Sequence, residues 1–198
     1  MSQTVRLKNV RLSFPDLFEA KEFKPGDKKP RYNASFLVEP GSDNDKAIEA
    51  AIVAAMKEKF LTKADQKLKD FRGQSNKDCY LDGSTKEYDG YEGMKVLSSH
   101  RRASDGPVGV YDKVGTYNEE KKKVVPNVLK ADSGKPYAGC YVNAVVEIYA
   151  QDGEFPGIRA GLQSVQYERE GDAFSGSKPP TAEDFDAVDA GVDADDIV

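Results

Sequence analysis

The chain has 198 residues, of which 38% are hydrophobic and 10% aromatic, so it can bury a core without disulfides or metals. Its one His and two Cys, at positions 100, 79 and 140, match neither a metal-ligand spacing nor a disulfide framework, and no signal peptide precedes them. The longest apolar run, about AAIVAAM, is far too short to span a bilayer. We therefore expect a soluble, cytoplasmic protein with reduced thiols, no membrane contact and no metal or cofactor.

The charge is divided unevenly along the chain. The net charge is −5, yet residues 181–198 contain seven acids and no Lys, Arg or His. Of the 34 acidic residues, 27 therefore lie in the rest of the chain, against all 29 basic ones. A slightly basic body followed by an acidic tail favours nucleic-acid or basic-protein partners. The tail acids are Glu183, Asp184, Asp186, Asp189, Asp193, Asp195 and Asp196.

The N-terminal region predicts two strands. Residues 4–14 alternate apolar and polar side chains, and the parity changes near Lys8–Asn9, which indicates a strand with a β-bulge that ends at Pro15. The charged residues 19–30 contain two prolines and a glycine, so they predict a loop. Residues 31–39 alternate again and predict the second strand.

Residues 43–60 predict the main helix. Ser42 or Asp43 can cap its N-terminus, and the carboxylates of its first turn favour the positive end of the helix dipole. An apolar residue recurs at every fourth position, which predicts a face that packs on the body. A second, shorter helical piece is expected within residues 63–71. The apolar stripe of the main helix consists of Ile48, Ile52, Met56 and Phe60.

The following region carries weaker patterns. Residues 73–93 have four glycines and no periodicity, so they predict a long loop. Residues 94–102 and 106–115 predict two short strands. The charged residues 118–125 predict a loop or the end of a hairpin.

The clearest strand covers residues 137–150, in which apolar and polar side chains alternate. After a turn, residues 158–169 return as its partner, with a parity change near Gln163–Ser164 that indicates another bulge. Two long, bulged strands joined by a tight loop are typical of a sheet that curves and closes on itself. Together with the one main helix, these patterns predict a mainly β protein built as a small, partly open antiparallel β-barrel. We place the domain in residues 1–175 and expect residues 176–198 to form a disordered acidic tail.

Aromatic side chains lie on the polar face of the strand at residues 137–150. Exposed rings on a sheet can stack on unpaired bases, and each such contact contributes roughly 1–3 kcal/mol. The alternative is that a second layer of structure covers the rings, since tyrosine is also a common strand residue. The rings are Tyr137, Tyr141 and Tyr149, of which Tyr149 lies at the strand end, where a barrel groove would open.

Three basic clusters could neutralise phosphates. Each cluster alone could equally be a solvated loop, but together with the tyrosines and a barrel they favour nucleic-acid binding. The clusters are Lys28, Lys29 and Arg31; His100, Arg101 and Arg102; and Lys121, Lys122 and Lys123.

Patterns that carry enzymatic chemistry are scarce. The sequence contains neither a GxxxxGK[ST] nor a GxGxxG phosphate loop. A nucleophilic Cys–His pair is disfavoured because Cys140 alternates with apolar residues on the predicted core face. The polar side of the predicted helix has charges of both signs, so sequence-specific reading of duplex DNA is not favoured either. We expect no catalytic site.

Several segments resemble phage-encoded single-stranded DNA-binding proteins. RLSFPDLFEA, a charged loop, RYNASFLVEP and DKAIEAAIVAAMKEKF resemble the start of these proteins, and YAGCYVNAVVEIYA with GIRAGLQSVQYER resembles their closing hairpin. The resemblance covers about residues 5–170 and extends to the tail in character. It implies an oligonucleotide-binding (OB) barrel that binds single strands without sequence preference during phage replication and recombination. It also implies that Tyr149, at the end of the long penultimate strand, stacks on DNA. Tails of this family often end in an aromatic residue, whereas this one ends in DDIV.

The resemblance and the charge pattern give one leading hypothesis. A basic groove binds single-stranded DNA, while the tail competes for the groove and recruits replication or recombination proteins; a homodimer is compatible with the exposed strand edges. Two alternatives stay open: a scaffold protein with a solubilising tail and, less favoured, a metal-dependent nuclease that uses scattered carboxylates. The candidate DNA-binding residues are Lys29, Arg31, Arg101, Arg102, Tyr111, Lys121, Lys122, Lys123, Tyr141 and Tyr149.

Overall fold

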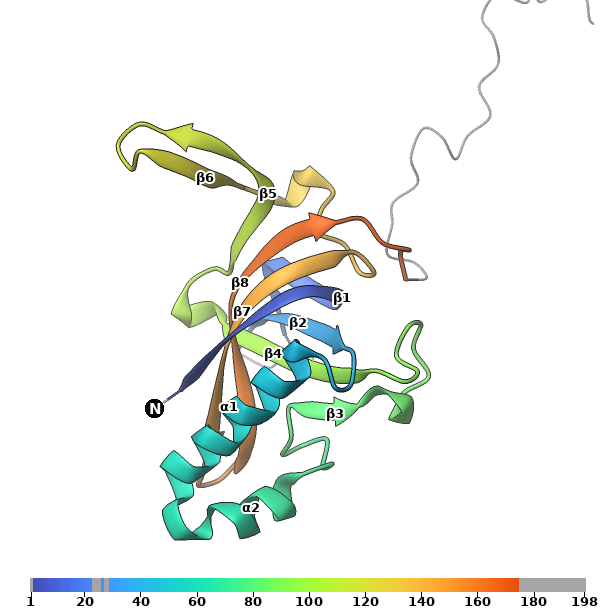
Figure 1. Cartoon of the computed structure of the whole chain (residues 1–198), viewed down its shortest axis with the longest axis vertical. Coiled ribbons are helices and arrows are strands. Elements are labelled where there is room, and N and C mark those ends of the chain that lie inside the picture. The colour runs from blue at the N-terminus through green and yellow to red at the C-terminus, as the bar shows by residue number, and fades with distance from the viewer. Residues whose placement is uncertain (1, 23–25, 27–28, 175–198) are drawn as a thin grey trace, which may run out of the picture.

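The computed structural model describes residues 2–22, 26 and 29–174 (Figure 1). The acidic tail predicted at residues 176–198, including its expected disorder, lies outside the described residues. The α-helices are α1 (Asp43–Phe60) and α2 (Ala64–Phe71), and neither is long and apolar enough to cross a membrane. The strands are β1 (Gln3–Lys21), β2 (Arg31–Val38), β3 (Tyr80–Asp82), β4 (Lys95–Arg102), β5 (Gly109–Asn118), β6 (Lys123–Val128), β7 (Tyr141–Gln151) and β8 (Gly157–Arg169). Single 3-10 turns are η1 (Leu61–Lys63), η2 (Gly83–Thr85), η3 (Ala103–Asp105) and η4 (Ala131–Ser133).

One eight-stranded sheet, in the order β3-β4-β2-β1-β7-β8-β5-β6, forms the body of the described chain. A further pairing of β4 with β8 closes β1, β2, β4, β8 and β7 into a five-stranded barrel. This closure is parallel and places His100 opposite Gly161. The predicted mainly β barrel with one main helix is therefore confirmed.

The barrel interior follows from the alternation of side chains in the β7–β8 hairpin. Every second residue of β7 is buried, and its neighbours on the opposite face are half-buried. Since β8 repeats the pattern, both strands of the hairpin turn an apolar face into one core. The buried residues of the two strands include Val142, Ala144, Val146, Ile148, Ile158, Ala160 and Leu162.

Both predicted bulges occur. The register of β1 against β7 shifts between Leu7 and Val10, as the parity change near Lys8–Asn9 predicts. The register of β7 against β8 shifts between the pairs that contain Ser164 and Leu162. Each shift moves the apolar side chains of the strand back onto the core face, which is why the sequence shows it as a change of parity.

The predicted end of the first strand at Pro15 is wrong, because β1 continues to Lys21. Phe14 has a φ of 46°, and the register of β1 against β2 shifts between Ser13 and Asp16. At such an irregularity the ladder does not require the N–H that proline lacks, so the strand passes through it. Residues 19–21, predicted as loop, therefore belong to the strand.

Helix α1 has the predicted bounds, and the Ser42 hydroxyl caps it by accepting a hydrogen bond from the Asp45 N–H at 3.2 Å. Its apolar stripe is buried, and the helix packs against β1 and β7 (Figure 1). The chain continues through η1 into α2, where the Phe71 ring contacts the Phe60 ring edge to face at 5.9 Å. The shorter helical piece expected within residues 63–71 is α2.

The segment at residues 73–93, predicted as a long loop, contains β3 and η2. Strand β3 pairs with the edge of β4 over three residues, which is too short to show periodicity in the sequence. The rings of Tyr80 and Tyr91 are buried, and the Tyr91 hydroxyl lies 3.1 Å from the Ser13 hydroxyl. Side-chain packing, rather than a repeated pattern, thus orders this segment.

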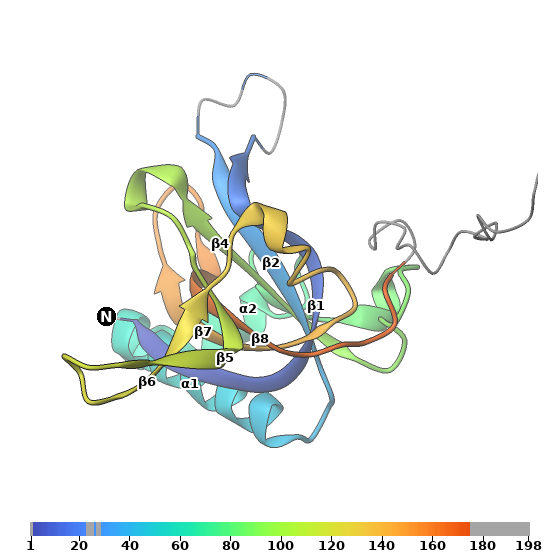
Figure 2. The same cartoon turned by 90° about the horizontal axis from the view of Figure 1, so that it is seen from above.

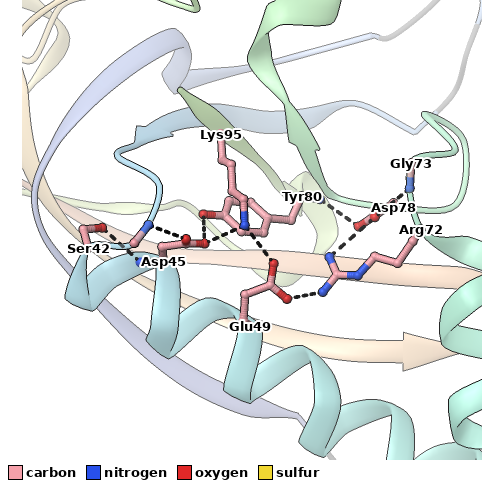
Figure 3. A network of polar contacts seen from close by, with 9 residues as sticks. Ser42, Asp45, Glu49, Arg72, Gly73, Asp78, Tyr80 and Lys95 are labelled. Atoms are coloured by element: carbon pink, nitrogen blue, oxygen red, sulfur yellow. Dashed lines mark hydrogen bonds and ion pairs between the residues drawn. The ribbon is translucent and has the colours of Figure 1, made fainter. Parts of the chain in front are cut away.

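A polar network joins α1 to β3 and β4 (Figure 3). The Asp45 carboxylate accepts hydrogen bonds from the Gly41 N–H at 2.7 Å and the Tyr80 hydroxyl at 2.8 Å. It also pairs with the Lys95 ammonium at 2.9 Å. Burial by itself would raise the pKa of Asp45, but the hydrogen bonds to its charged form outweigh burial and lower the pKa.

The network continues to α2 and the segment that follows it. Lys95 also reaches Glu49 at 3.1 Å, and Glu49 pairs with Arg72. The Arg72 guanidinium lies 3.6 Å from the buried Asp78 carboxylate, which accepts the Gly73 N–H at 3.2 Å. These contacts fix residues 72–80 to the barrel (Figure 3).

The hairpin of β5 and β6 projects from one side of the barrel (Figures 1 and 2). Strand β5 pairs with β8 only at residues 109–111, whereas β6 pairs with β5 alone among the described strands. We call residues 113–128 the arm. The charged residues 118–125, predicted as a loop or hairpin end, form its tip.

Candidate nucleic-acid interface

The five barrel strands β1, β2, β4, β7 and β8 follow the order of an OB barrel. In this fold the outer face of the second and third strands binds oligonucleotides, together with the loops between strands one and two and between strands four and five. The corresponding elements here are the outer face of β2 and β4, the β1–β2 connection and the β7–β8 turn.

Two cross-strand pairs carry cations on the outer face of β2 and β4. Arg31 lies opposite Arg102, and Asn33 lies opposite His100. Side chains of one face alternate along a strand, so Arg31 and Asn33 of β2 point outward, away from the core residue Ala34. The sequence cluster of His100 and Arg102 therefore meets the cluster of Arg31 across the sheet.

Strand β8 adds a third arginine to this face. His100 lies opposite Gly161 across the barrel closure, and Arg159 is two residues away on the same face of β8. Burial lowers the pKa of His100, and the positive charges of Arg31, Arg159 and Arg102 lower it further. His100 is therefore mainly neutral at pH 7 and gains its charge below its usual range.

Tyr149 completes the cluster. It lies opposite Arg159 in the β7–β8 hairpin, at the end of β7 next to the turn. Burial raises the pKa of Tyr149, while the charges of Arg102 and Arg159 lower it, so the half-buried ring lies among the arginines. We call the surface formed by Arg31, His100, Arg102, Tyr149 and Arg159 the β2–β4 patch.

The backbone of the fixed segment at residues 72–80 holds Arg159 in place. The Arg159 Nη2 donates to the Asn76 carbonyl at 3.0 Å, and the neighbouring Ile158 N–H donates to the Lys77 carbonyl at 2.6 Å. Because Asp78 and Arg72 anchor this segment, the polar network of Figure 3 positions one wall of the β2–β4 patch. The arginine contributes charge from a preorganised position.

The other predicted residues fall into separate places. Lys29 is exposed two residues before Arg31, at the start of the patch. Arg101 points to the inner side of β4, where its guanidinium donates to the carbonyls of Gly106 (2.9 Å) and Asp105 and to the side chain of Gln163 (2.9 Å). Arg101 thus fixes the turn at η3 and is committed to contacts within the chain.

Tyr141 lies far from Tyr149, although both rings are on the outer face of β7. Their positions differ by eight residues, which corresponds to roughly 26 Å along a strand. The Arg169 guanidinium lies 3.4 Å from the centre of the Tyr141 ring, and that of Arg11 lies 5.9 Å from it. Arginines thus already contact this ring, and a base would have to displace one of them to stack. Tyr137, predicted on the same face, is buried.

Tyr111 and the three lysines belong to a third region. Tyr111 lines a groove of about 590 Å³ between the arm and the barrel, together with Arg6, Lys8 and Pro126. The lysines form the tip of the arm. The structure therefore divides the predicted set between the β2–β4 patch and the surroundings of the arm. The residues at the tip are Lys121, Lys122 and Lys123.

Sequence reasoning left two members of the patch out of the candidate set. His100 stands beside Arg101 and Arg102 in one of the basic clusters of the sequence, but it was not included in the candidate set. Arg159 stands alone in the sequence, but the antiparallel hairpin places it opposite Tyr149. Pairing the two predicted strands residue by residue would have found it.

Metal clusters and reactive thiols are two kinds of site that could support catalysis in the described part of the chain. Residues 2–22, 26 and 29–174 contain no cluster of three His, Cys, Asp or Glu side chains that could hold a metal ion. Burial raises the pKa of the Cys79 thiol to about 12 and that of the Cys140 thiol to about 11. Both thiols are therefore protonated and unreactive at neutral pH.

Comparisons with known proteins agree with this geometry. The model of the family described as "Enterobacter phage Enc34, ssDNA-binding protein" matches residues 3–198. Protein p50 of Acyrthosiphon pisum secondary endosymbiont phage 1 is 37% identical over 185 residues, which cover 92% of each chain.

Two solved structures share the fold. The single-stranded DNA-binding protein of bacteriophage Enc34 in complex with ssDNA aligns with a TM-score of 0.64 and 20% identity, over 86% of this chain and 88% of that one. The single-stranded DNA-binding protein gp2.5 of bacteriophage T7 aligns with a TM-score of 0.52 and 11% identity, over 97% and 98% of the two chains. The family match over nearly the whole chain and the OB-type barrel lead to one conclusion: the chain belongs to the Enc34 family of phage single-stranded DNA-binding proteins.

Proposed function

We propose that this protein binds single-stranded DNA without sequence preference through the β2–β4 patch. The observation that carries the proposal is the position of Arg102 and Arg159 beside Tyr149, with Arg31 directly opposite Arg102, on the face that OB barrels use for oligonucleotides. Arginines release counterions from the phosphates and supply a sequence-independent part of the affinity. The tyrosine offers a face on which any base can stack.

The patch is suited to unpaired strands rather than to the duplex. No helix of the described chain presents side chains to this surface, so the major groove has no reading element there. A single tyrosine ring among arginines can stack on a base that is not paired in a duplex. Every base has an aromatic face for this contact, so the contact does not depend on sequence. Binding, rather than catalysis, is the proposed activity, in the cytoplasm of the host cell.

The acidic tail has a proposed role as a competitor and a handle. Seven carboxylates without a basic residue can occupy a cationic surface, and a tethered segment reaches an effective concentration around the millimolar range. DNA that displaces the tail frees it to recruit replication or recombination proteins. The separation between a slightly basic body and an acidic end supports this part of the proposal.

The test is a titration of a labelled oligonucleotide of single-site length with the full chain. Tyr149→Ala is expected to weaken binding by roughly 1–3 kcal/mol through lost stacking. Tyr117→Ala, a change of the same type on the exposed arm, is the matched control and should leave the affinity unchanged. Equal affinities for Tyr149→Ala and the unchanged protein would remove the β2–β4 patch from the binding site.

The tail requires a separate titration. A chain that ends after Pro180 should bind the same oligonucleotide more tightly than the full chain at low salt, because it has lost the competing carboxylates. The gain should fade as salt screens the competition. If neither form binds at low salt, the scaffold hypothesis with a solubilising tail replaces the proposal. A parallel incubation with Mg²⁺ checks that the labelled strand is not cleaved.

A further inference from the structure

The arm exposes more apolar surface than a solvated hairpin requires. Four of its five large apolar side chains are 55% to 70% exposed, and β6 has no partner on its outer edge among the described strands. Natural proteins usually protect such an edge, because unpaired backbone groups beside apolar side chains invite another chain. Tyr117 and Val124 lie directly opposite each other on one face of the hairpin. The exposed side chains are Val114, Tyr117, Val124 and Val128.

A concave counterpart lies on another side of the molecule. A groove of about 840 Å³ runs between the outer part of β1, the segment around Tyr88, the residues after η4 and Phe174; we call it the aromatic groove. The Phe14 and Tyr88 rings meet edge to face at 5.0 Å, yet both are about half exposed, at 53% and 51%. Phe18 adds a third exposed ring. Within the described chain these rings line a hollow rather than a closed core.

The charged residues that line the aromatic groove and those of the arm tip have small net charges of opposite sign. The lysines that line the aromatic groove are paired, Lys21 with Asp16 at 2.6 Å and Lys135 with Asp112 at 2.8 Å. The groove is also lined by the carboxylates of Glu87 and Asp89. The arm tip carries Glu119 and Glu120 followed by three consecutive lysines, Lys121 to Lys123, so its net charge is +1. An apolar arm with a net positive tip therefore fits an aromatic groove with a net negative lining.

We propose that the arm of one copy docks in the aromatic groove of a second copy of this chain. The arm and the segment that contains Tyr88 lie on opposite sides of the barrel in both views (Figures 1 and 2). A contact between two different surfaces on opposite sides is heterologous and repeats from copy to copy; it produces an open chain when the rotation between copies does not close a ring. An open chain of copies matches a linear lattice such as single-stranded DNA, and in this respect the inference rests on the proposed function. The contact supplies cooperativity along the strand.

Cross-linking tests the docking directly. Cys79 and Cys140 are buried, so a cysteine placed on the surface is the reactive thiol of its chain. One full-length variant carries Val124→Cys on the arm, and a second carries Ala131→Cys at the rim of the aromatic groove, where the substitution removes no ring. A short bismaleimide should join the mixed variants into dimers, and it should do so at high protein concentration without DNA as well as on oligo(dT) of about 60 nucleotides, which holds several copies. Each variant alone should give far less product.

Two results would overturn the inference. Efficient cross-linking of Val124→Cys by itself would show an arm-to-arm, isologous contact. The absence of cross-links in the mixture, with and without DNA, would leave the two surfaces without the proposed partner. The cross-linking reaction without DNA does not depend on DNA binding. Its outcome is therefore separate from that of the Tyr149→Ala titration.

Cooperativity provides the second measurement. The double variant Val124→Thr and Val128→Thr keeps the β-branched shape of the arm but makes its surface polar. It should bind a single-site oligonucleotide as the unchanged protein does, and it should lose cooperativity on oligo(dT), with roughly ten-fold weaker apparent affinity there. Tyr88→Ser, on the groove side, should give the same pattern. If binding of the short oligonucleotide falls as much as binding of the long one, the arm is a DNA contact and the inference fails.

Discussion

The β2–β4 patch and the arm carry similar basic clusters, yet the structure builds them differently. The patch lies on four strands of the closed barrel, and hydrogen bonds to the backbone of residues 76 and 77 hold its Arg159 and β8 in place. The arm consists of two strands outside the barrel, and its lysines are at an exposed turn. Charge alone does not distinguish a binding site from a solvated loop. The distinction lies in how many neighbours hold the cations before a ligand arrives.

The largest expected difference between the barrel and the arm is in the rate of amide hydrogen exchange. Amides of β7, which is paired on both sides within the barrel, should exchange only through global unfolding, which costs about 5–15 kcal/mol in ordinary domains. Amides at residues 115–118 of the arm should open at a cost roughly 3 kcal/mol or more below that, and hence at least 100-fold faster. Mass spectrometry of exchanged peptides measures both regions at once. Equal protection would mean that the arm is as firmly held as the barrel.

The next largest effect concerns the network that supports the patch. Asp45→Ala leaves the Lys95 ammonium and the Tyr80 hydroxyl without their carboxylate partner, so we expect a loss of about 3 kcal/mol in the free energy of unfolding. This value is at the lower end for a broken buried pair, because Lys95 is still partly in contact with water. Urea unfolding measures the loss. The control is Asp43→Ala, which removes an exposed carboxylate from the same helix turn and should have little effect.

The same residue should show its role in the pH dependence of stability. The folded pKa of Asp45 is lower than the unfolded value, so its contribution is present above the unfolded pKa of about 3.9 and is lost as pH falls through the folded pKa. The difference in stability between the unchanged protein and Asp45→Ala should therefore narrow below about pH 4. A constant difference down to pH 2.5 would contradict the assignment of a charged, hydrogen-bonded carboxylate.

The salt dependence of oligonucleotide affinity should distinguish the two basic regions, with a smaller effect. Arg102→Ala in the patch should reduce the slope of log K against log salt for a single-site oligonucleotide by about 0.7, the value for one phosphate on a single strand. Lys121→Ala on the arm tip should leave that slope unchanged. The measurement is fluorescence anisotropy between about 50 and 200 mM salt. A change in slope for Lys121→Ala and none for Arg102→Ala would reverse the roles of the two regions.

The smallest effect comes from His100. Because burial and three arginines lower its pKa, His100 is mainly neutral at pH 7 and becomes charged as pH falls below about 6.5. Its charge then adds to the patch, so oligonucleotide affinity should rise a few-fold as the pH falls through this lowered pKa. In His100→Gln this part of the rise should disappear. Identical pH profiles for the two proteins would place His100 away from the bound strand.

The sequence predicted the regular parts of the fold well. The bounds of α1, the β7–β8 hairpin and both bulges follow from periodicity, because each places apolar residues on one face of a regular element. The continuation of β1 beyond Pro15 and the buried packing of residues 73–93 were missed. Both depend on contacts with distant residues, such as that between Tyr91 and Ser13, which leave no local pattern.

The candidate site was predicted in part for the same reason. Tyr149, Arg31 and Arg102 stood out by type and by their place at strand ends, and the barrel brings them to one face. Arg101 has the same charge as Arg102 but the opposite parity, so its guanidinium turns inward to carbonyls. Its separation from the patch could be read only from the strand register. The distance between Tyr141 and Tyr149 likewise follows from strand length, which composition does not reveal.

The closure of the barrel has a mechanical consequence. Strands β4 and β8 meet in a single parallel bridge, between His100 and Gly161, and this seam lies in the middle of the β2–β4 patch. A strand of DNA that contacts both Arg102 on β4 and Arg159 on β8 would bridge this seam. Ligand would then hold together the weakest line of pairing in the barrel. When force is applied to separate β4 from β8, the DNA-free protein should unfold at a lower force than the DNA-bound protein.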